Sequence, residues 1–316
     1  MLTKSVEYIK VFVKWLVISL LIGALGGVVG SVFHILIDKA TEFRHHNGWI
    51  IYLLPVGGLL IAYMYRVFKK QGKIDTNRVI LSIRENEKIP LVMVPLIFVS
   101  TVITHLLGGS AGREGAALQL GGGIGYNVGR LFKLNEGDMR IIVMCGMAAV
   151  FAALFGTPLT AAVFALEVIR VGIFNYAGLL PCIMSAVSAY GTALVFGIAP
   201  VRFLIPEISL LPVNVAKVIV LSILCALISI LFCVTIHKTE HFMKKSISNR
   251  YLRTVVGAVV IVLLSLVFRS GDYNGAGTEV IARAMTGDAN IEAFLVKIIF
   301  TAITISAGFK SNFLQT

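Results

Sequence analysis

Charged residues are scarce in this sequence of 316 residues: Asp, Glu, Lys and Arg together make up 14%, while 57% of the residues are hydrophobic. A soluble protein of this length needs far more polar surface, so the composition excludes that class. The mean hydropathy of +0.90 also indicates a membrane protein with several spans. We find no low-complexity segment and predict no soluble domain.

Cysteine is also rare, and its four residues lie singly in apolar segments with no CxxC spacing. We expect buried free thiols there. The six histidines offer little metal-ligand spacing, and a solvated face is favoured over a metal role for the pair His237 and His241. The GxxxxGK[ST], HExxH and GxSxG motifs are missing as well. We therefore predict no metal, no cofactor and no enzyme.

Acidic residues are outnumbered by basic ones, 16 to 28, which gives a net charge of +12. The basic residues cluster between apolar segments, which fits the positive-inside rule better than nucleic-acid binding. The clusters follow the N-terminus, the second apolar segment and the segment that ends near Lys244. We predict a multi-pass protein of the cell membrane with a cytoplasmic N-terminus, and place the short 45–48 connection outside.

The apolar segments predict an all-α protein with roughly ten membrane-embedded helices of uneven length, some of them re-entrant. The first apolar segment, from about Val11 to Ile37, is too long for a signal-peptide core. Its glycines at 23, 26, 27 and 30 are spaced for close helix packing. The expected helices span Leu16–Ile37, Trp49–Phe68, Thr76–Glu85, Ile89–Leu107, a segment from near Ala116, Met139–Phe155, Leu159–Val171, Ala177–Phe196, Val213–Val234, Val255–Phe268, Val280–Met285 and Ile291–Ala307.

One stretch, Gly108 to Gly129, reads GGSAGREGAALQLGGGIGYNVG and places Arg113 and Glu114 between long apolar segments. Glycines allow close backbone approach, and the helix expected from near Ala116 presents unpaired N–H groups at its N-terminus. Together they predict an anion site that the Glu114 carboxylate occupies or vacates. The alternative is a salt bridge between Glu114 and Arg113 that stabilises a re-entrant turn. Arg113 is more readily interpreted as an anchor for the loop than as a contact of the ion.

Two other groups of polar residues leave alternatives open. Glu167 is an acid in an apolar segment, either in a structural ion pair or on a proton path. Its partner would be Arg170 or a residue of another helix. Asp75, Thr76 and Asn77 open a short expected helix, where they serve as N-caps or face an ion pathway.

The segment GREGAALQLGGGIG resembles the G(K/R)EGP…Q.GG.IG motif of the CLC chloride channels and proton-coupled anion antiporters, with Ala116 in place of the proline. The sequences GTPL from Gly156 and FALE from Phe164 look like the next pair of helices in that family. The resemblance runs in order from the first span to about Lys310. It implies a CLC-like inverted-repeat bundle with broken helices, a first repeat over 1–172 and an incomplete second repeat over 177–316.

The resemblance also implies roles for individual residues. Glu114 matches the gating glutamate that passes protons, and the backbone N–H groups of Gly112, Arg113 and Gly115 would bind the anion. Glu167 matches an acid of the family, as a structural or proton-path residue. The next position, where chloride antiporters often carry a proton-transfer glutamate, is Val168.

The polar insert distinguishes two branches of the family. Chloride-selective members carry GSGIP there, whereas residues 72–79 of this chain resemble the asparagine-containing variant of the fluoride-exporting branch. This implies an anion-binding role for Thr76 and Asn77. The AGFK segment that ends at Lys310 resembles the start of GFKGGE in the same branch. These features favour fluoride over chloride.

We therefore expect fluoride export coupled to protons, with fluoride or chloride, protons and membrane lipid as partners. A chloride channel or chloride/proton antiporter is the alternative within transport. The family also implies a homodimer. The chain stops after a foreign-looking 311–316 tail, where the rest of the second repeat is expected. A truncated membrane remnant that transports nothing is therefore the alternative from another class.

Overall fold

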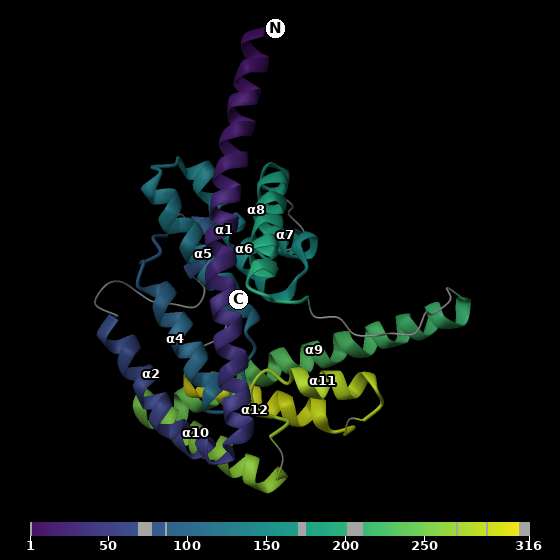
Figure 1. The fold of residues 1–316 in the computed structure, drawn as a ribbon. Coiled ribbons are helices and arrows are strands. Elements are labelled where there is room, and N and C mark those ends of the chain that lie inside the picture. Colours follow the sequence, from purple (N-terminus) through teal and green to yellow (C-terminus); the bar gives the residue numbers. More distant parts are fainter. Residues whose placement is uncertain are drawn as a thin grey trace.

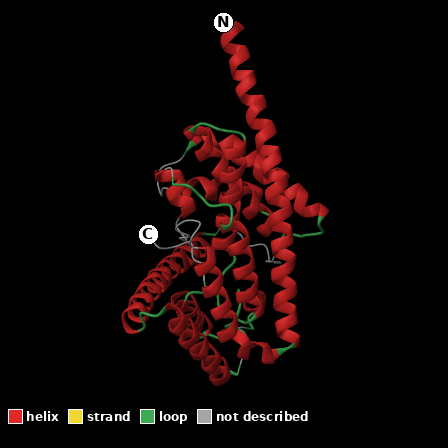
Figure 2. Ribbon diagram, turned by 90° about the vertical axis from the view of Figure 1, so that its left-hand side faces the viewer, coloured by secondary structure: helices red, strands yellow, loops and turns green. Residues whose placement is uncertain are grey.

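The computed structural model describes residues 2–68, 78–85, 87–169, 175–200, 211–269, 271–288 and 290–309. All regular structure in these ranges is helical (Figures 1 and 2), which confirms the all-α prediction. The elements are α1 (Leu2–His46), the 3-10 helix η1 (Gly48–Leu53), α2 (Leu54–Phe68), α3 (Arg78–Glu85), α4 (Met93–Leu106), α5 (Glu114–Leu131), α6 (Glu136–Phe155), α7 (Pro158–Glu167), α8 (Tyr176–Val195), α9 (Pro212–Ser246), α10 (Arg250–Phe268), α11 (Thr278–Met285) and α12 (Ala293–Ala307).

Six helical segments of the described chain are long and apolar enough to cross a membrane, which confirms a multi-span protein. Three shorter helices, α4, α7 and α12, are also apolar, so the predicted uneven lengths are present. The six are Ile9–His46, Gly48–Phe68, Glu136–Phe155, Tyr176–Val195, Pro212–Ser246 and Arg250–Phe268.

Several helix boundaries differ from the expected ones. Helices α1 and α9 extend well beyond their apolar segments, because hydropathy marks where a helix is apolar and not where its backbone hydrogen bonds stop. Helix α5 begins at Glu114, two residues before Ala116. The caps proposed for α3, Asp75 and Thr76, lie outside the described residues.

Local sequence signals set the break between α6 and α7. The Asn135 side chain caps α6 by accepting a hydrogen bond from the backbone N–H of Asp138 at 2.9 Å. Gly156 ends the helix with φ at 68°, a left-handed conformation that favours glycine. Pro158 then starts α7, where its missing N–H costs no hydrogen bond.

The glycines of α1 form two packing faces, as their spacing predicted. A Cβ atom added at Gly23 or Gly27 would lie 2.5 or 2.7 Å from side-chain or backbone atoms of α8. At Gly26 or Gly30 it would lie 2.7 or 2.9 Å from an alanine Cβ of α6. Glycine therefore lets α1 pack closely against both helices.

Backbone contact is closest between α5 and α6. A Cβ atom at Gly121 would lie 2.1 Å from the carbonyl oxygen of Gly146, and one at Gly146 would lie equally near that of Gly121. Gly125 makes the same kind of contact, 2.3 Å from the carbonyl oxygen of Ile142. The glycine-rich second half of the 108–129 stretch thus serves helix packing.

The buried apolar side chains form two main clusters. One joins α1 and the helices α3, α4, α5, α7 and α8 around α6, whose buried part runs from Ile142 to Leu154. The other joins η1, α2, α4, α9, α10 and α12, and contains the fully buried Phe300 and Phe309. Helix α2 of the expected first repeat therefore packs against α10 of the expected second one. The boundary of the two repeats near residue 172 stays a prediction.

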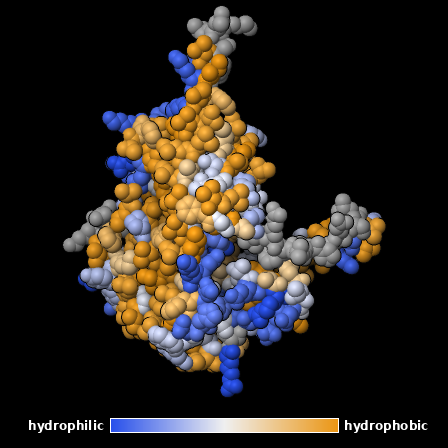
Figure 3. Space-filling view, in the orientation of Figure 1, coloured by the Kyte–Doolittle hydropathy of each residue, from blue (hydrophilic) through white to orange (hydrophobic). Residues whose placement is uncertain are grey.

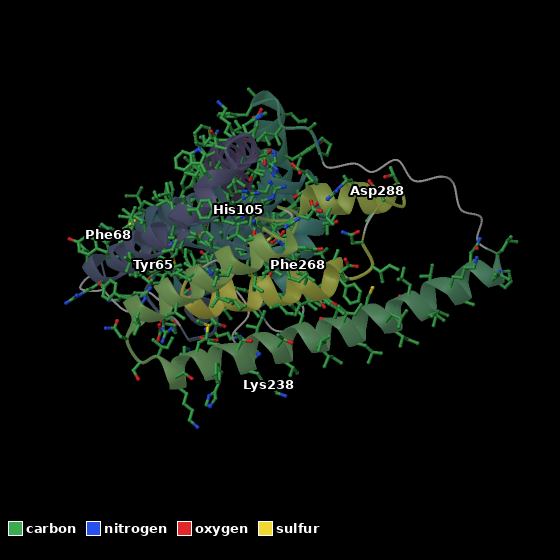
Figure 4. All side chains as sticks on the ribbon, turned by 90° about the horizontal axis from the view of Figure 1, so that it is seen from below. Tyr65, Phe68, His105, Lys238, Phe268 and Asp288 are labelled. Atoms are coloured by element: carbon green, nitrogen blue, oxygen red, sulfur yellow. The ribbon has the colours of Figure 1, made fainter. Side chains whose placement is uncertain are left out.

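Helix α9 lies on the outside of the molecule, and only Ile236 and Met243 on it are buried (Figures 1 and 4). Cys225 and Cys233 are exposed on this helix, so the prediction of buried thiols is wrong for them. An apolar segment of this length is also typical of a membrane span, whose side chains need not be buried within the protein. Cys145 and Cys182 are buried as predicted, with their Sγ atoms 3.9 Å apart.

Candidate functional site

The site centres on the segment Gly108 to Arg113, between the end of α4 and the start of α5. Gly108 turns the chain with φ at 85°, which favours glycine. The backbone N–H of Gly109 then donates to the carbonyl of Thr104 at 2.8 Å and closes the end of α4. The segment is almost entirely buried, so its polar groups need partners within the protein.

Helix α12 supplies two of these partners. The backbone N–H of Ser110 donates to Oγ1 of Thr304 at 3.1 Å. The hydroxyl of Ser110 lies 2.9 Å from Oγ1 of Thr301. All three residues are buried. Hydroxyl groups of α12 therefore fix the position of a loop more than 190 residues away in sequence.

The loop between α10 and α11 covers the segment from another side. The backbone N–H of Gly275 donates to the carbonyl of Gly109 at 3.2 Å. The ammonium group of Lys297, on α12, donates to the carbonyls of Tyr273 at 3.1 Å and Gly275 at 2.6 Å. Lys297 therefore holds this loop against the segment.

Arg113 is buried and contacts helix α1. Its Nη1 lies 3.0 Å from Nδ1 of His34 and 3.3 Å from Oδ1 of Asp38. Its guanidinium carbon lies 5.5 Å from the centre of the Phe155 ring. These contacts support the interpretation of Arg113 as an anchor of the loop. The guanidinium group of Arg113 pairs with the Asp38 carboxylate of α1 and not with the Glu114 carboxylate.

Glu114 is the first residue of α5 and is exposed. Its carboxylate lies against the backbone of Gly112, since a Cβ atom there would be 2.1 Å from Oε2. The first backbone bond at this helix start runs from the N–H of Ala117 to the carbonyl of Arg113 at 2.9 Å. The N–H groups of Glu114, Gly115 and Ala116 thus have no acceptor within the helix. This arrangement places an exposed carboxylate beside a positive helix end.

Replacing Gly112 by alanine is expected to displace the Glu114 carboxylate without unfolding the protein. The added Cβ would meet only the end of a flexible side chain, which can rotate away. A forced rotamer change costs about 0.5–1.5 kcal/mol, a shift of roughly 2- to 12-fold in side-chain populations. Anion flux and thermal stability should be measured on the same preparation. A large loss of stability with unchanged flux would contradict the contact.

Basic side chains lie next to the segment Gly108 to Arg113. Arg44 of α1 is buried and donates from Nη1 to the carbonyl of His105. His105 is fully buried in α4, with Nδ1 2.9 Å from the carbonyl of Thr101, and Figure 4 shows it in the interior. Arg44 beside the end of α4 and Arg113 at the start of α5 thus lie at the two ends of the segment, and Lys297 contacts the loop that covers it.

A cavity of about 560 Å³ opens between the C-terminal half of α1 and the 271–280 segment. Arg113 reaches it from the site, and ion pairs link its walls, among them Nε2 of His45 to Oε1 of Glu279 at 3.4 Å. Figure 3 shows a hydrophilic patch over the lower part of α1 and over α11, on an otherwise largely apolar face. The cavity therefore gives water and ions a polar approach to Arg113.

Other predicted residues lie elsewhere. Thr76 and Asn77 are outside the described residues. Glu167 is exposed at the C-terminal end of α7 and does not line the cavity, and its proposed partner Arg170 is also outside the described residues. Its two interpretations both stay open.

Sequence reasoning missed Ser110, Thr301 and Thr304, which carry no signal beyond being hydroxyl residues in apolar surroundings. It also missed Lys297, for which a signal existed. Lys297 is the one charged residue of the apolar stretch Ala293–Ala307, and charges in such stretches are rare and usually functional.

Comparison with known proteins places this geometry in context. Residues 57–313 match the sequence family described as voltage-gated chloride channel. The chain is 32% identical to a chloride/fluoride channel protein of Pseudomonas syringae pv. tomato, over 98% of this chain and 70% of that protein.

Solved structures give the same result. A crystal structure of a CLC-type fluoride/proton antiporter superposes with a TM-score of 0.89 at 34% identity, covering 94% of this chain and 76% of that one. A slow cyanobacterial Cl⁻/H⁺ antiporter shares the fold, with a TM-score of 0.78 at 20% identity. It covers 93% of this chain and 74% of its own.

Proposed function

The chain belongs to the CLC family of chloride channels and related anion transporters, and we propose that it exchanges fluoride for protons across the cell membrane. Members of this family are channels and transporters and not enzymes, as the missing catalytic motifs predicted. Within that family, the proposal specifies which anion is transported, that its transport is coupled to protons, and which residues take part.

Similarity supports fluoride. The solved relative at 34% identity is a fluoride/proton antiporter, and the curated relative at 32% carries both chloride and fluoride in its name. The chloride/proton antiporter structure is only 20% identical, so its similarity supports the fold and not the choice of anion. Chloride remains the competing anion.

The observation that carries the proposal is the position of Glu114. Its carboxylate is exposed at the start of α5, against Gly112 and beside N–H groups that lack acceptors within the helix. A carboxylate and a fluoride ion are both anions that accept hydrogen bonds, so each can occupy this helix end. When Glu114 binds a proton it loses its charge and can leave the position to the anion. Alternation of this kind links anion and proton movement.

The same reasoning gives roles to the neighbouring residues. The N–H groups of Gly112, Arg113 and Gly115 would contact the anion, together with Thr76 and Asn77 from the polar insert. We further propose a cytoplasmic N-terminus, as the basic clusters of the sequence predict, and a homodimer, as the family resemblance implies.

Fluoride efflux from liposomes containing the purified protein tests the proposal. We expect efflux well above that of empty liposomes, faster for fluoride than for chloride, and accompanied by proton uptake into the liposomes. A fluoride electrode, a chloride electrode and an internal pH dye measure the three fluxes on one preparation.

Two results would contradict the proposal. Faster chloride than fluoride efflux would identify a chloride transporter. Absence of efflux, from protein shown by size-exclusion chromatography to be folded, would favour a membrane protein that transports neither ion.

A further inference from the structure

Arginine and tyrosine side chains join α2 to α10 where two apolar spans end. Tyr65 and Arg66 lie near the end of α2, and Arg250 and Tyr251 begin α10. The guanidinium carbon of Arg250 lies 5.3 Å from the centre of the Tyr65 ring, and that of Arg66 lies 6.0 Å from the centre of the Tyr251 ring. Figure 4 shows Tyr65 on the side of the molecule where α9 ends and α10 begins. Each helix thus packs one arginine on a tyrosine of the other, at the level of the membrane interface.

A third arginine adds to this positive charge. Arg253 follows Arg250 by three residues on α10, and its Nη1 donates to a backbone carbonyl at 3.3 Å. Among the described residues, no carboxylate forms an ion pair with Arg66, Arg250 or Arg253. The acid at the end of α9, Glu240, pairs with Lys244. Within this part of the chain, the three arginines therefore form a cluster of one sign.

Two of these guanidinium groups also have a nitrogen atom without an acceptor in the described part of the chain. Nη2 of Arg250 and Nε of Arg253 are buried atoms with no hydrogen-bond partner there. Such a buried donor costs free energy until an acceptor reaches it. Both side chains remain partly exposed, so a ligand can approach them from the surface. A phosphate group fits the arginines best, because it offers several acceptor oxygens together with negative charge.

An exposed apolar face of α10 continues from the arginines. Leu252, Val256, Val259 and Leu263 are exposed by 55, 36, 42 and 55%. Residues three or four apart share one face of a helix, so these four side chains form a stripe, and Arg253 lies beside it because it precedes Val256 by three residues. A free phosphate ion has no use for this stripe. A phospholipid uses both parts, the arginines for its headgroup and the stripe for an acyl chain.

We propose that Arg66, Arg250 and Arg253 bind the phosphate of an anionic phospholipid, with an acyl chain along the exposed face of α10. This site goes beyond the proposed function, because it concerns the lipid-facing surface and not the transported ion. The bound headgroup bridges α2 and α10 and compensates three like charges. Anionic lipid therefore stabilises the packing of these two helices.

The test is binding of phosphatidylglycerol to the purified, delipidated full chain, followed by native mass spectrometry. Phosphatidylcholine with the same acyl chains is the zwitterionic comparison and should bind more weakly. Each basic residue near an anionic lipid contributes about five-fold to affinity. Arg250→Gln combined with Arg253→Gln should therefore weaken phosphatidylglycerol binding on the order of 30-fold. Replacing both residues by lysine keeps the charges and should retain most of the binding.

The matched control is Arg130→Gln combined with Lys133→Gln. These two residues are exposed, lie three positions apart like the arginines, and remove the same charge. Equal weakening by the control pair would show that net charge alone attracts the lipid, and would overturn the site. Equally tight binding of phosphatidylcholine would overturn it as well. Displacement of phosphatidylglycerol by inorganic phosphate would identify a site for the free ion and contradict the assignment to lipid.

A second variant covers a failure of the double variant to fold. Arg66 is exposed, so Arg66→Gln leaves no buried group unpaired and should weaken binding by about five-fold. Thermal unfolding in detergent gives an independent measurement. Phosphatidylglycerol should raise the Tm of the wild type more than that of either glutamine variant. An equal rise in a folded glutamine variant would overturn the proposal, whatever the result of the fluoride assay.

Discussion

Replacing Glu114 by glutamine is expected to abolish proton movement through the protein and to remove the pH dependence of fluoride efflux. Glutamine has nearly the shape of glutamate but cannot bind or release a proton at physiological pH. Positioned proton-transfer groups contribute on the order of 100-fold or more to the rates they serve. We therefore expect coupled proton uptake to fall by about that factor, to the background of empty liposomes.

The measurement is simultaneous recording of fluoride efflux and internal pH in liposomes, over a range of external pH. Glu292→Gln is the matched control, because Glu292 is exposed at the start of α12 and its side chain forms no capping hydrogen bond. It should behave as the wild type. Proton uptake that survives in Glu114→Gln would place the proton path elsewhere.

Glu167→Gln decides the interpretation of the second acid in the same assay. Glu167 is exposed at the end of α7, in an unfavourable position at the negative end of a helix dipole. A proton-path role predicts slower proton uptake with fluoride efflux retained. A structural role predicts lower stability with the coupling unchanged.

Replacing Gly121 by alanine is expected to prevent α5 and α6 from packing. The added Cβ would lie 2.1 Å from the carbonyl oxygen of Gly146, and a backbone atom cannot rotate away as a side chain can. Overpacking costs typically about 1–3 kcal/mol, and we expect the upper end of that range or more, since two helix backbones would have to separate. Because α5 carries Glu114 at its start, anion flux should be lost with the fold.

Thermal unfolding in detergent, followed by size-exclusion chromatography, measures the effect. Gly191→Ala is the matched control: Gly191 also lies within a helix, and no atom lies within 4 Å of an added Cβ. Alanine there should be neutral or stabilising by up to about 1 kcal/mol, because it favours helix more than glycine does. Equal stability of the two variants would contradict the close approach of α5 and α6.

The sequence by itself predicted only part of the site. It identified the 108–129 stretch and the acid at its centre, because a charge between apolar segments is visible without a structure. It could not show that Arg113 turns to Asp38 on α1, since nothing local links residues 75 positions apart. It could not show the partners of the individual glycines, such as the contact of Gly112 with the Glu114 carboxylate and that of Gly121 with α6.

What the sequence determined by itself is the set of apolar helices, the break at Gly156 and Pro158, the close packing of α1 through its glycines and the resemblance to the family. These follow from residue type and short-range spacing, and so from interactions within a few residues. Only the tertiary structure decided that Thr301, Thr304 and Lys297 of α12 hold the segment before Glu114, and that α9 stays exposed. Such contacts join segments up to 194 residues apart, and their partners are chosen by the packing of whole helices, which no local pattern encodes.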